Sequence, residues 1–375
     1  MFPRSDEERL LAQVLRGEPL AWPPRQDEDV VVRRLLELCE QDGLIPLLHH
    51  HLRATPEWAA WPAAVHDKLA RATRIVAAVD MLREVELVAV LAALADAGVE
   101  GLLLKGAALA YTHYRDPALR SRSDTDLLIA VRDRAVTTAT LEALGYRRPN
   151  AVSGRFVSYE EYFTRSIGQL DHVVDLHWQV NNMPVFANSL AYEEMRARAV
   201  AVPQLGPHAR TLYPPHALLL ACMHRAGHRA IDGPEVERRI WLYDIHLLAT
   251  AMSATEWREF IEQCVAKEMR EICIDALEAA RHAYGTAYPA GLFEALSHSG
   301  KRELSANFLE ADQNAALRLA LRALPKWRDR AALIKEMLFP PSAYVLGKYG
   351  VQGRWRLPWL YLRRAVEGVR KRRRR

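Results

Sequence analysis

The sequence has no run of eighteen or more apolar residues, so a conventional membrane-spanning helix is not expected. Its first thirty residues are rich in Asp, Glu and Arg and lack the apolar centre of a secretion signal. The four cysteines are scattered, without the close pairs typical of a zinc site or a disulfide framework: Cys39, Cys222, Cys264 and Cys273. These absences predict a cytoplasmic protein whose cysteines are buried as small apolar residues.

Internal repeats are also absent, and the one compositionally biased segment is the basic C-terminal tail. The chain has 375 residues, of which 50% are hydrophobic, enough to bury a substantial core. We therefore expect an ordered protein built from two or three packed units.

Positive charge is concentrated at one end of the chain. Residues 354–375 contain ten Arg or Lys and one Glu, a net charge of +9, whereas the whole chain carries +5 and the other 353 residues therefore carry −4. A slightly acidic body does not fit a surface for duplex DNA, because such surfaces depend on many contacts from Lys and Arg to phosphates.

The tail itself has two interpretations. Its aromatic residues alternate with basic ones, as in helices that lie on a membrane surface, which would give weak contact with the inner membrane and a peripheral location. Alternatively, a final helix packs its Leu and Trp side chains on the body and ends in a charged extension.

The strongest functional pattern lies between residues 101 and 126. An apolar run that breaks at Gly106 predicts a buried strand, a tight turn and a helix. Asp124 and Asp126 open a second apolar run, and strand residues two apart point to the same face. Two such carboxylates can hold one cation, and hard oxygen ligands suit Mg²⁺ bound together with substrate phosphates.

A third carboxylate follows in a segment whose polar and apolar residues alternate, from Leu170 to Trp178. The alternation predicts a strand with Asp175 on its polar face, where it could face the first two acids. Asp171 lies on the same face but nearer a turn, so we favour Asp175. Three carboxylates around two cations are the usual arrangement for in-line phosphoryl or nucleotidyl transfer.

These blocks resemble the uncharacterised branch of the polymerase-beta-like nucleotidyltransferase superfamily, which is common in bacteria. The specific matches are Lys105-Gly106, Arg120 through Leu128, and Val174 through Trp178. Looser matches are Leu218 through His224, Trp241 through Asp244, Phe339 through Pro341 and a following Tyr-Leu-Arg-Arg run. The resemblance implies an α+β fold, with a polymerase-beta-like core of a small mixed sheet and helices, flanked by mainly helical regions.

The resemblance also implies an activity: transfer of a nucleoside monophosphate from an NTP such as ATP to an acceptor, with release of pyrophosphate. The implied cofactor is Mg²⁺, with Mn²⁺ as an alternative. The acceptor stays open between a sugar, a small molecule, a protein and an RNA end. Asp124, Asp126 and Asp175 would be the catalytic and metal-binding residues.

Nucleotide binding is assigned by the resemblance to Lys105, Gly106, Ala107 and Arg120. Ala107 departs from the superfamily signature, which has Ser or Gly here, so backbone amides at a helix N-terminus and Lys105 are left to hold the triphosphate. Lys105 could instead pair with one of the acids. Arg120 and Arg122 could clamp phosphate or lie in a solvated turn, with Arg120 favoured because it occupies the family position.

Four regions are expected along the chain. They are a helical region (1–97), the nucleotidyltransferase core (98–202), a C-terminal helical domain (203–353) and the basic aromatic tail (354–375). Within the core, the pattern predicts a helix over 132–144 that ends at Gly145.

Two other functions remain open. His224 and His228 would share a helix face and could bind zinc in a metal hydrolase if Asp244 or His246 supplied a third ligand, although they could equally be structural. The protein could also be a catalytically inactive scaffold that keeps the nucleotidyltransferase fold for binding. His177 could orient Asp175 or face solvent.

Overall fold

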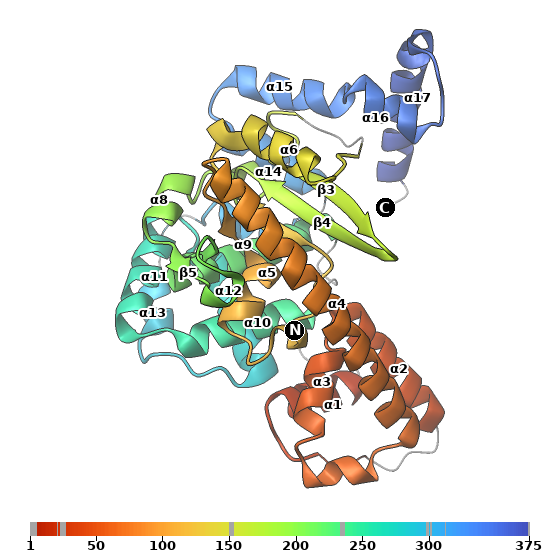
Figure 1. The fold of residues 1–375 in the computed structure, drawn as a ribbon. Coiled ribbons are helices and arrows are strands. Elements are labelled where there is room, and N and C mark those ends of the chain that lie inside the picture. The colour runs from red at the N-terminus through yellow and green to blue at the C-terminus, as the bar shows by residue number, and fades with distance from the viewer. Residues whose placement is uncertain are drawn as a thin grey trace.

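A mixed sheet of six strands lies at the centre of the protein, with helices on both faces (Figure 1). The computed structural model describes residues 6–20, 22, 28–149, 154–232, 237–297, 300, 302–311 and 313–373. Among these residues, no helix is both long and apolar enough to cross a membrane.

The sheet has the strand order β3-β4-β2-β1-β6-β5. Its strands are β1 (Leu102–Leu103), β2 (Thr125–Leu128), β3 (Glu160–Ile167), β4 (Leu170–His177), β5 (Val200–Ala201) and β6 (Arg210–Thr211). The pairs β2 with β4 and β1 with β6 are parallel, and the other neighbours are antiparallel. The sheet is therefore small and mixed, as the sequence predicts.

Helices make up the rest of the fold. Those before the sheet are α1 (Asp6–Leu15), α2 (Glu28–Asp42), α3 (Ile45–Leu52) and α4 (Ala63–Asp96). Those between strands are α5 (Lys105–Thr112), α6 (Arg134–Ala143), α7 (Pro184–Ala187) and α8 (Tyr192–Ala197). After the sheet come α9 (Pro214–Asp232), α10 (Arg239–Ala251), α11 (Ala254–Ala266), α12 (Arg270–Tyr284), α13 (Leu292–Leu296), α14 (Gln313–Ala323), α15 (Trp327–Leu338), α16 (Ser342–Lys348) and α17 (Leu357–Arg373).

One face of the sheet packs against α4 and α6. Leu127 of β2 and Leu176 of β4 are fully buried in a core with Leu91 of α4 and Leu141 of α6. Successive side chains of a strand point to opposite faces of the sheet. Asp126 and Asp175, which directly precede these leucines, therefore point to the other face. The apolar face thus fixes which side of the sheet carries the acids.

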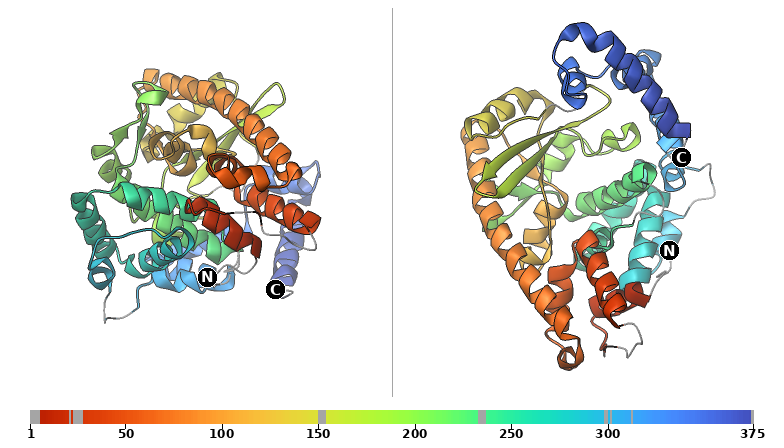
Figure 2. Two further views of the ribbon diagram at one scale, coloured as in Figure 1. Left: turned by 90° about the horizontal axis from the view of Figure 1, so that it is seen from below. Right: turned by 90° about the vertical axis from the view of Figure 1, so that its right-hand side faces the viewer.

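The opposite face of the sheet looks toward the C-terminal helices. A larger core joins Leu102 and Leu128 of the sheet to α1–α3 and to α9–α12. Figure 2 shows the red N-terminal helices beside the green-blue helices that follow the sheet. The four cysteines are buried and unpaired, as expected. Helices from both ends of the chain therefore share one core, and the division into four regions remains a prediction.

The α+β assignment is confirmed, including the strand and helix around Gly106, the strand that follows Asp124 and the strand that carries Asp175. The predicted helix over 132–144 corresponds to α6, and Gly145 follows it with a φ of +89°. Of the basic tail, residues 374–375 and the side chains beyond Glu367 lie outside the part that the structure describes.

Candidate active site

Parallel pairing of β2 with β4 places two carboxylates side by side. Asp126 lies directly opposite Asp175 in the register of the two strands. Asp171, the rival at the other end of β4, is exposed and accepts a hydrogen bond of 2.5 Å from Ser166. The structure thus brings Asp175, rather than Asp171, to Asp126.

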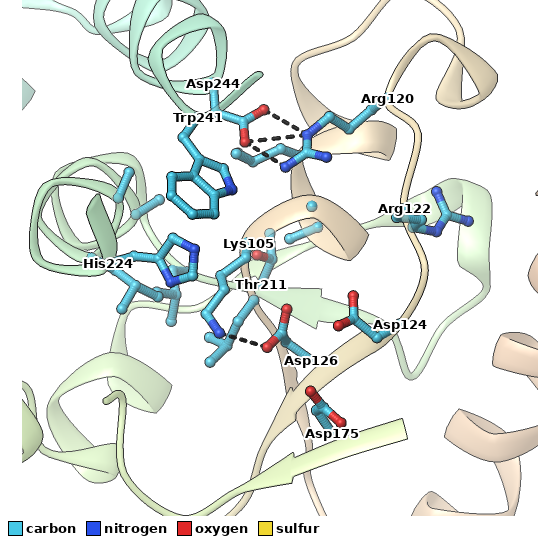
Figure 3. A pocket seen from close by; sticks show the side chains of 18 of the residues that line it. Lys105, Arg120, Arg122, Asp124, Asp126, Asp175, Thr211, His224, Trp241 and Asp244 are labelled. Carbon is cyan, nitrogen blue, oxygen red and sulfur yellow. Dashed lines mark hydrogen bonds and ion pairs between the residues drawn. The ribbon is translucent and has the colours of Figure 1, made fainter. Parts of the chain in front are cut away.

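Asp124 immediately precedes β2 and points toward the same place. Figure 3 shows the carboxyl groups of Asp124, Asp126 and Asp175 converging at the wall of a pocket. The pocket has a volume of about 610 Å³ and lies between the sheet, α5 and the helices α9 and α10. The three acids predicted from sequence are therefore together in one cavity.

Asp126 is held from two sides. The Lys105 ammonium donates to Asp126 Oδ1 over 2.6 Å, and His177 Nε2 lies 2.8 Å from the same oxygen. His177 is only 2% exposed, and its Nδ1 lies 3.2 Å from Glu160. The interpretation of His177 as solvent-facing is therefore wrong, and the carboxylates at its two ring nitrogens are Asp126 and Glu160 instead of Asp175.

The three acids differ in how readily they ionise. Burial opposes ionisation of Asp126, but the charge of Lys105 and the hydrogen bond from His177 hold its pKa below the usual value. Burial raises the pKa of Asp175 to about 7, and the charges of Asp126 and Asp124 add to this effect. Burial and the Asp126 charge also raise the pKa of Asp124.

A divalent cation fits this arrangement. Ligand atoms of Asp126, Asp175 and His177 lie within 4.8 Å of one another. Carboxylate oxygens are hard donors suited to Mg²⁺ or Mn²⁺, whereas the His177 nitrogen nearer the site is already at hydrogen-bond distance from Asp126. The raised pKa values of Asp124 and Asp175 reflect burial first and then repulsion between the carboxylates, and a cation among them would relieve that repulsion.

Lys105 begins helix α5 in an unusual backbone conformation, with a φ of +50°. A left-handed conformation is costly for a residue with a side chain, and such strain concentrates at functional sites. Here it accompanies the ion pair with Asp126. The alternative that Lys105 pairs with an acid is thus confirmed, while its contact with a nucleotide stays a prediction.

The next two residues of α5 have different surroundings. A Cβ atom on Gly106 would lie 3.2 Å from the Arg120 guanidinium, so glycine leaves room for Arg120. Ala107 is fully buried and its side chain is not part of the pocket lining. A serine hydroxyl at residue 107 would therefore not point into the cavity. The groups of this turn that can bind phosphate are its backbone amides.

Arg120 forms a buried ion pair with α10. Its Nε and Nη2 donate to the two oxygens of Asp244 over 2.8 and 2.7 Å, and the Tyr114 hydroxyl donates to Asp244 over 2.8 Å. Arg120 is 7% and Asp244 5% exposed. Arg120 is therefore not in a solvated turn, and its charge is largely balanced by Asp244.

Arg122 is engaged on the other side of the same loop. Its Nη2 lies 2.7 Å from Asp80 of α4 and donates to the Tyr111 hydroxyl over 2.9 Å. In Figure 3 its side chain points away from the three acids. The loop that carries Asp124 is thus tied to α10 through Arg120 and to α4 through Arg122.

The wall opposite the acids is aromatic. Trp241 and His224 point toward Lys105 in Figure 3, and the His224 and His228 rings each lie 4.8 Å from Trp241. Burial, with the charge of Lys105, lowers the pKa of His224 well below its usual value, which favours the neutral ring.

The zinc alternative gains no third ligand. Asp244 is paired with Arg120, and His246 Nδ1 lies 2.9 Å from the Thr286 hydroxyl. Within the described part of the chain, the set of three side chains placed to share an ion is Asp126, Asp175 and His177. His224 and His228 therefore serve as part of the aromatic wall.

Other pocket residues were not identified from sequence. Glu160 starts β3 opposite His177, Thr211 of β6 donates to the Leu103 carbonyl over 2.9 Å, and Arg238 lies 5.5 Å from the Trp241 ring. No short motif marks these residues. They come to the site through strand pairing and helix packing, which a local pattern does not specify.

Replacing Asp175 by Asn should stabilise the metal-free protein. Since the folded protein retains the Asp175 proton up to about pH 7 and the unfolded chain releases it near pH 4, the free energy of unfolding falls as pH rises between these values. Asp175→Asn removes this loss, so we expect a gain of about 1–2 kcal/mol at about pH 8 in EDTA, after allowance for solvent screening. Urea denaturation measures it.

The same variant should lose the stabilisation that Mg²⁺ or Mn²⁺ gives the wild type. Asp171→Asn, an exposed change on the same strand, is the control and should respond to the ions as the wild type does. A Mg²⁺-induced rise in Tm that is equal in Asp175→Asn and wild type would contradict a metal site at Asp175.

Removing Asp244 should destabilise the fold, because it leaves the Arg120 guanidinium buried without a partner. We expect Asp244→Ala to cost about 3–5 kcal/mol of unfolding free energy. The control is Glu193→Ala, which breaks an exposed ion pair with Arg132 and should cost no more than about 1 kcal/mol. Equal losses in denaturant titrations of the two variants would show that the buried pair does not tie α10 to the loop.

Comparison with known proteins agrees with the geometry. A family model described as uncharacterised nucleotidyltransferase matches residues 28–285, more than half of the chain. No curated protein sequence matches. Among solved structures, an antigenic nucleotidyltransferase-like protein from Paracoccidioides brasiliensis is similar over 56% of this chain and 96% of its own, at 14% identity and a TM-score of 0.32. On the family match, this chain belongs to the uncharacterised nucleotidyltransferase family.

Proposed function

We propose that the protein transfers a nucleoside monophosphate from an NTP to an acceptor hydroxyl and releases pyrophosphate, with Mg²⁺ as cofactor. The observation that carries this proposal is the convergence of Asp124, Asp126 and Asp175 at one wall of the pocket. In the reaction the acceptor oxygen bonds to the α-phosphorus, the bond from that phosphorus to the bridging oxygen breaks, and the acceptor proton passes to solvent.

The triphosphate would lie at the start of α5. Backbone N–H groups in the first turn of a helix have no partner within the helix and favour anions. Gly106 lines the pocket and supplies such a group next to Lys105, whereas Ala107 does not line the pocket. Arg238 adds a positive charge at the pocket. Lys105 and Arg120 are already balanced by carboxylates, so these two cations do not by themselves neutralise a triphosphate.

Asp124, Asp126 and Asp175 would hold the metal. Mg²⁺ bound there would offset the charge that develops on the phosphate and acidify the acceptor hydroxyl. Lys105 and His177 keep Asp126 ionised and fixed in position, so this carboxylate is ready for an ion without reorganisation.

Trp241 would provide a stacking surface for the base. Its ring borders the cavity from α10, opposite the acids, and every nucleobase presents an aromatic face to such a surface. Stacking of this kind tolerates any base. The acceptor, whether a sugar, small molecule, protein or RNA end, must approach the same cavity of about 610 Å³ with one hydroxyl.

A catalytically inactive binding protein is the second candidate, supported by the ion pair between Lys105 and Asp126 in the site. The two candidates can be distinguished because the inactive protein would bind NTPs without converting them to products.

Removing the paired acids should abolish Mg²⁺-dependent nucleotide binding and transfer. We expect calorimetric titration of ATP, GTP, CTP and UTP with Mg²⁺ to show binding to the wild type and none to Asp124→Ala combined with Asp126→Ala. Incubation with labelled NTPs and a cell extract should label an acceptor with the wild type and at least about 100-fold less with Asp175→Ala. Ser166→Ala, at the far end of the β3–β4 pair, is the control.

Equal nucleotide binding by wild type and the double variant would overturn the metal-assisted site. Binding that depends on the acids, without labelling of any acceptor in extract, would favour the inactive binding protein.

Truncating Trp241 should weaken nucleotide binding without affecting the metal. Loss of one base-stacking contact costs about 1–3 kcal/mol, so Trp241→Ala should raise the NTP Kd by about 5-fold to 150-fold while leaving the Mn²⁺-induced rise in Tm unchanged. Trp327→Ala, which removes a Trp that is 72% exposed on α15, serves as the control. An unchanged NTP Kd in Trp241→Ala would place the base elsewhere.

A further inference from the structure

Helix α17 docks on the body through one face only. Leu360 is fully buried, and the Tyr361 hydroxyl donates to the Pro340 carbonyl over 2.8 Å. Arg364 donates to the Met337 carbonyl over 2.6 Å, and Glu367 accepts from the Tyr349 hydroxyl over 2.8 Å. These contacts fix which side of the helix faces outward.

The outward face is apolar. Trp359, Leu362 and Val366 are 58%, 64% and 42% exposed. Their spacing places them within about 60° of one another around the helix. Trp355, just before the helix, is 77% exposed. The helix lies at the edge of the molecule in each view (Figures 1 and 2).

Basic groups surround these side chains. The Arg363 guanidinium lies 5.6 Å from the Trp359 ring, and that of Arg356 lies 4.8 Å from the Trp355 ring. Residues 354–375 carry a net charge of +9. Exposed indoles interleaved with guanidinium groups suit the boundary between anionic headgroups and acyl chains.

We propose that this face, formed by Trp355, Trp359, Leu362 and Val366, binds the surface of a bilayer that contains anionic lipids. The helix lies in the plane of the interface, since none in the described chain could span a membrane. A second copy of the protein is a poor occupant, because its equivalent face would bring the same positive charge. Packing of the tail on the body, the alternative interpretation, holds for Leu360 but not for Trp359, which is exposed.

Vesicle binding by the full-length protein tests the proposal. We expect co-sedimentation with phosphatidylcholine vesicles that contain about 30% phosphatidylglycerol, at least tenfold weaker binding to pure phosphatidylcholine, and a decrease between about 0.1 and 0.5 M NaCl. Replacing both Trp359 and Leu362 by Glu should reduce the partition coefficient at least tenfold.

The matched control replaces Met81 and Val85 of α4 by Glu, which makes the same charge change at side chains that are 69% and 71% exposed. It should bind vesicles as the wild type does, and both double variants should keep the wild-type Tm. No binding to anionic vesicles at low salt, or equal losses in the two variants, would overturn the proposal. A further outcome would also overturn the proposal: polyuridylate displaces the protein fully from vesicles, and the α17 variant binds them as the wild type does. The binding surface would then be a general polyanion site.

Discussion

The register between β2 and β4 is the constraint on which the site depends, because it holds Asp126 and Asp175 side by side. Lys105 and His177 both contact Asp126, whereas burial and the charges of Asp126 and Asp124 raise the pKa of Asp175 to about 7. The apolar face of the same strands fixes this register despite the repulsion between the acids. There Leu127 and Leu176 are fully buried, and slipping the register by one residue would exchange these leucines with the acids.

Much of this arrangement could be predicted from local patterns. The Asp-x-Asp spacing and the alternation around Asp175 specify which side chains share a strand face, and the position of Gly145 marks the end of α6. The partners of these residues could not be predicted. Asp244 lies 124 residues from Arg120, and nothing near either one indicates the pair. The positive φ of Lys105 is likewise set by tertiary contacts, since lysine has no local preference for it.

The helical regions are part of the site and do more than flank it. Arg120 reaches Asp244 of α10, and Arg122 reaches Asp80 of α4, so the loop before β2 is fixed from both sides. A boundary drawn from composition at residue 97 or 203 therefore separates groups that act on the same loop. The motif residues therefore lie within one part of the chain, whereas the residues that hold them in position come from segments before and after that part.

Charge is distributed so that two kinds of recognition use different parts of the molecule. The tail of residues 354–375 carries +9 and the remaining chain −4, so an anionic surface attracts one end and repels the rest. The pocket, in contrast, gathers the carboxyl groups of Asp124, Asp126 and Asp175, so that the proposed binding of a triphosphate would depend on a cation. Salt screens the exposed tail far more than the buried acids. Raising the ionic strength should therefore weaken membrane-surface binding, whereas removing divalent ions should weaken nucleotide binding. The two proposed activities are therefore separable within one chain.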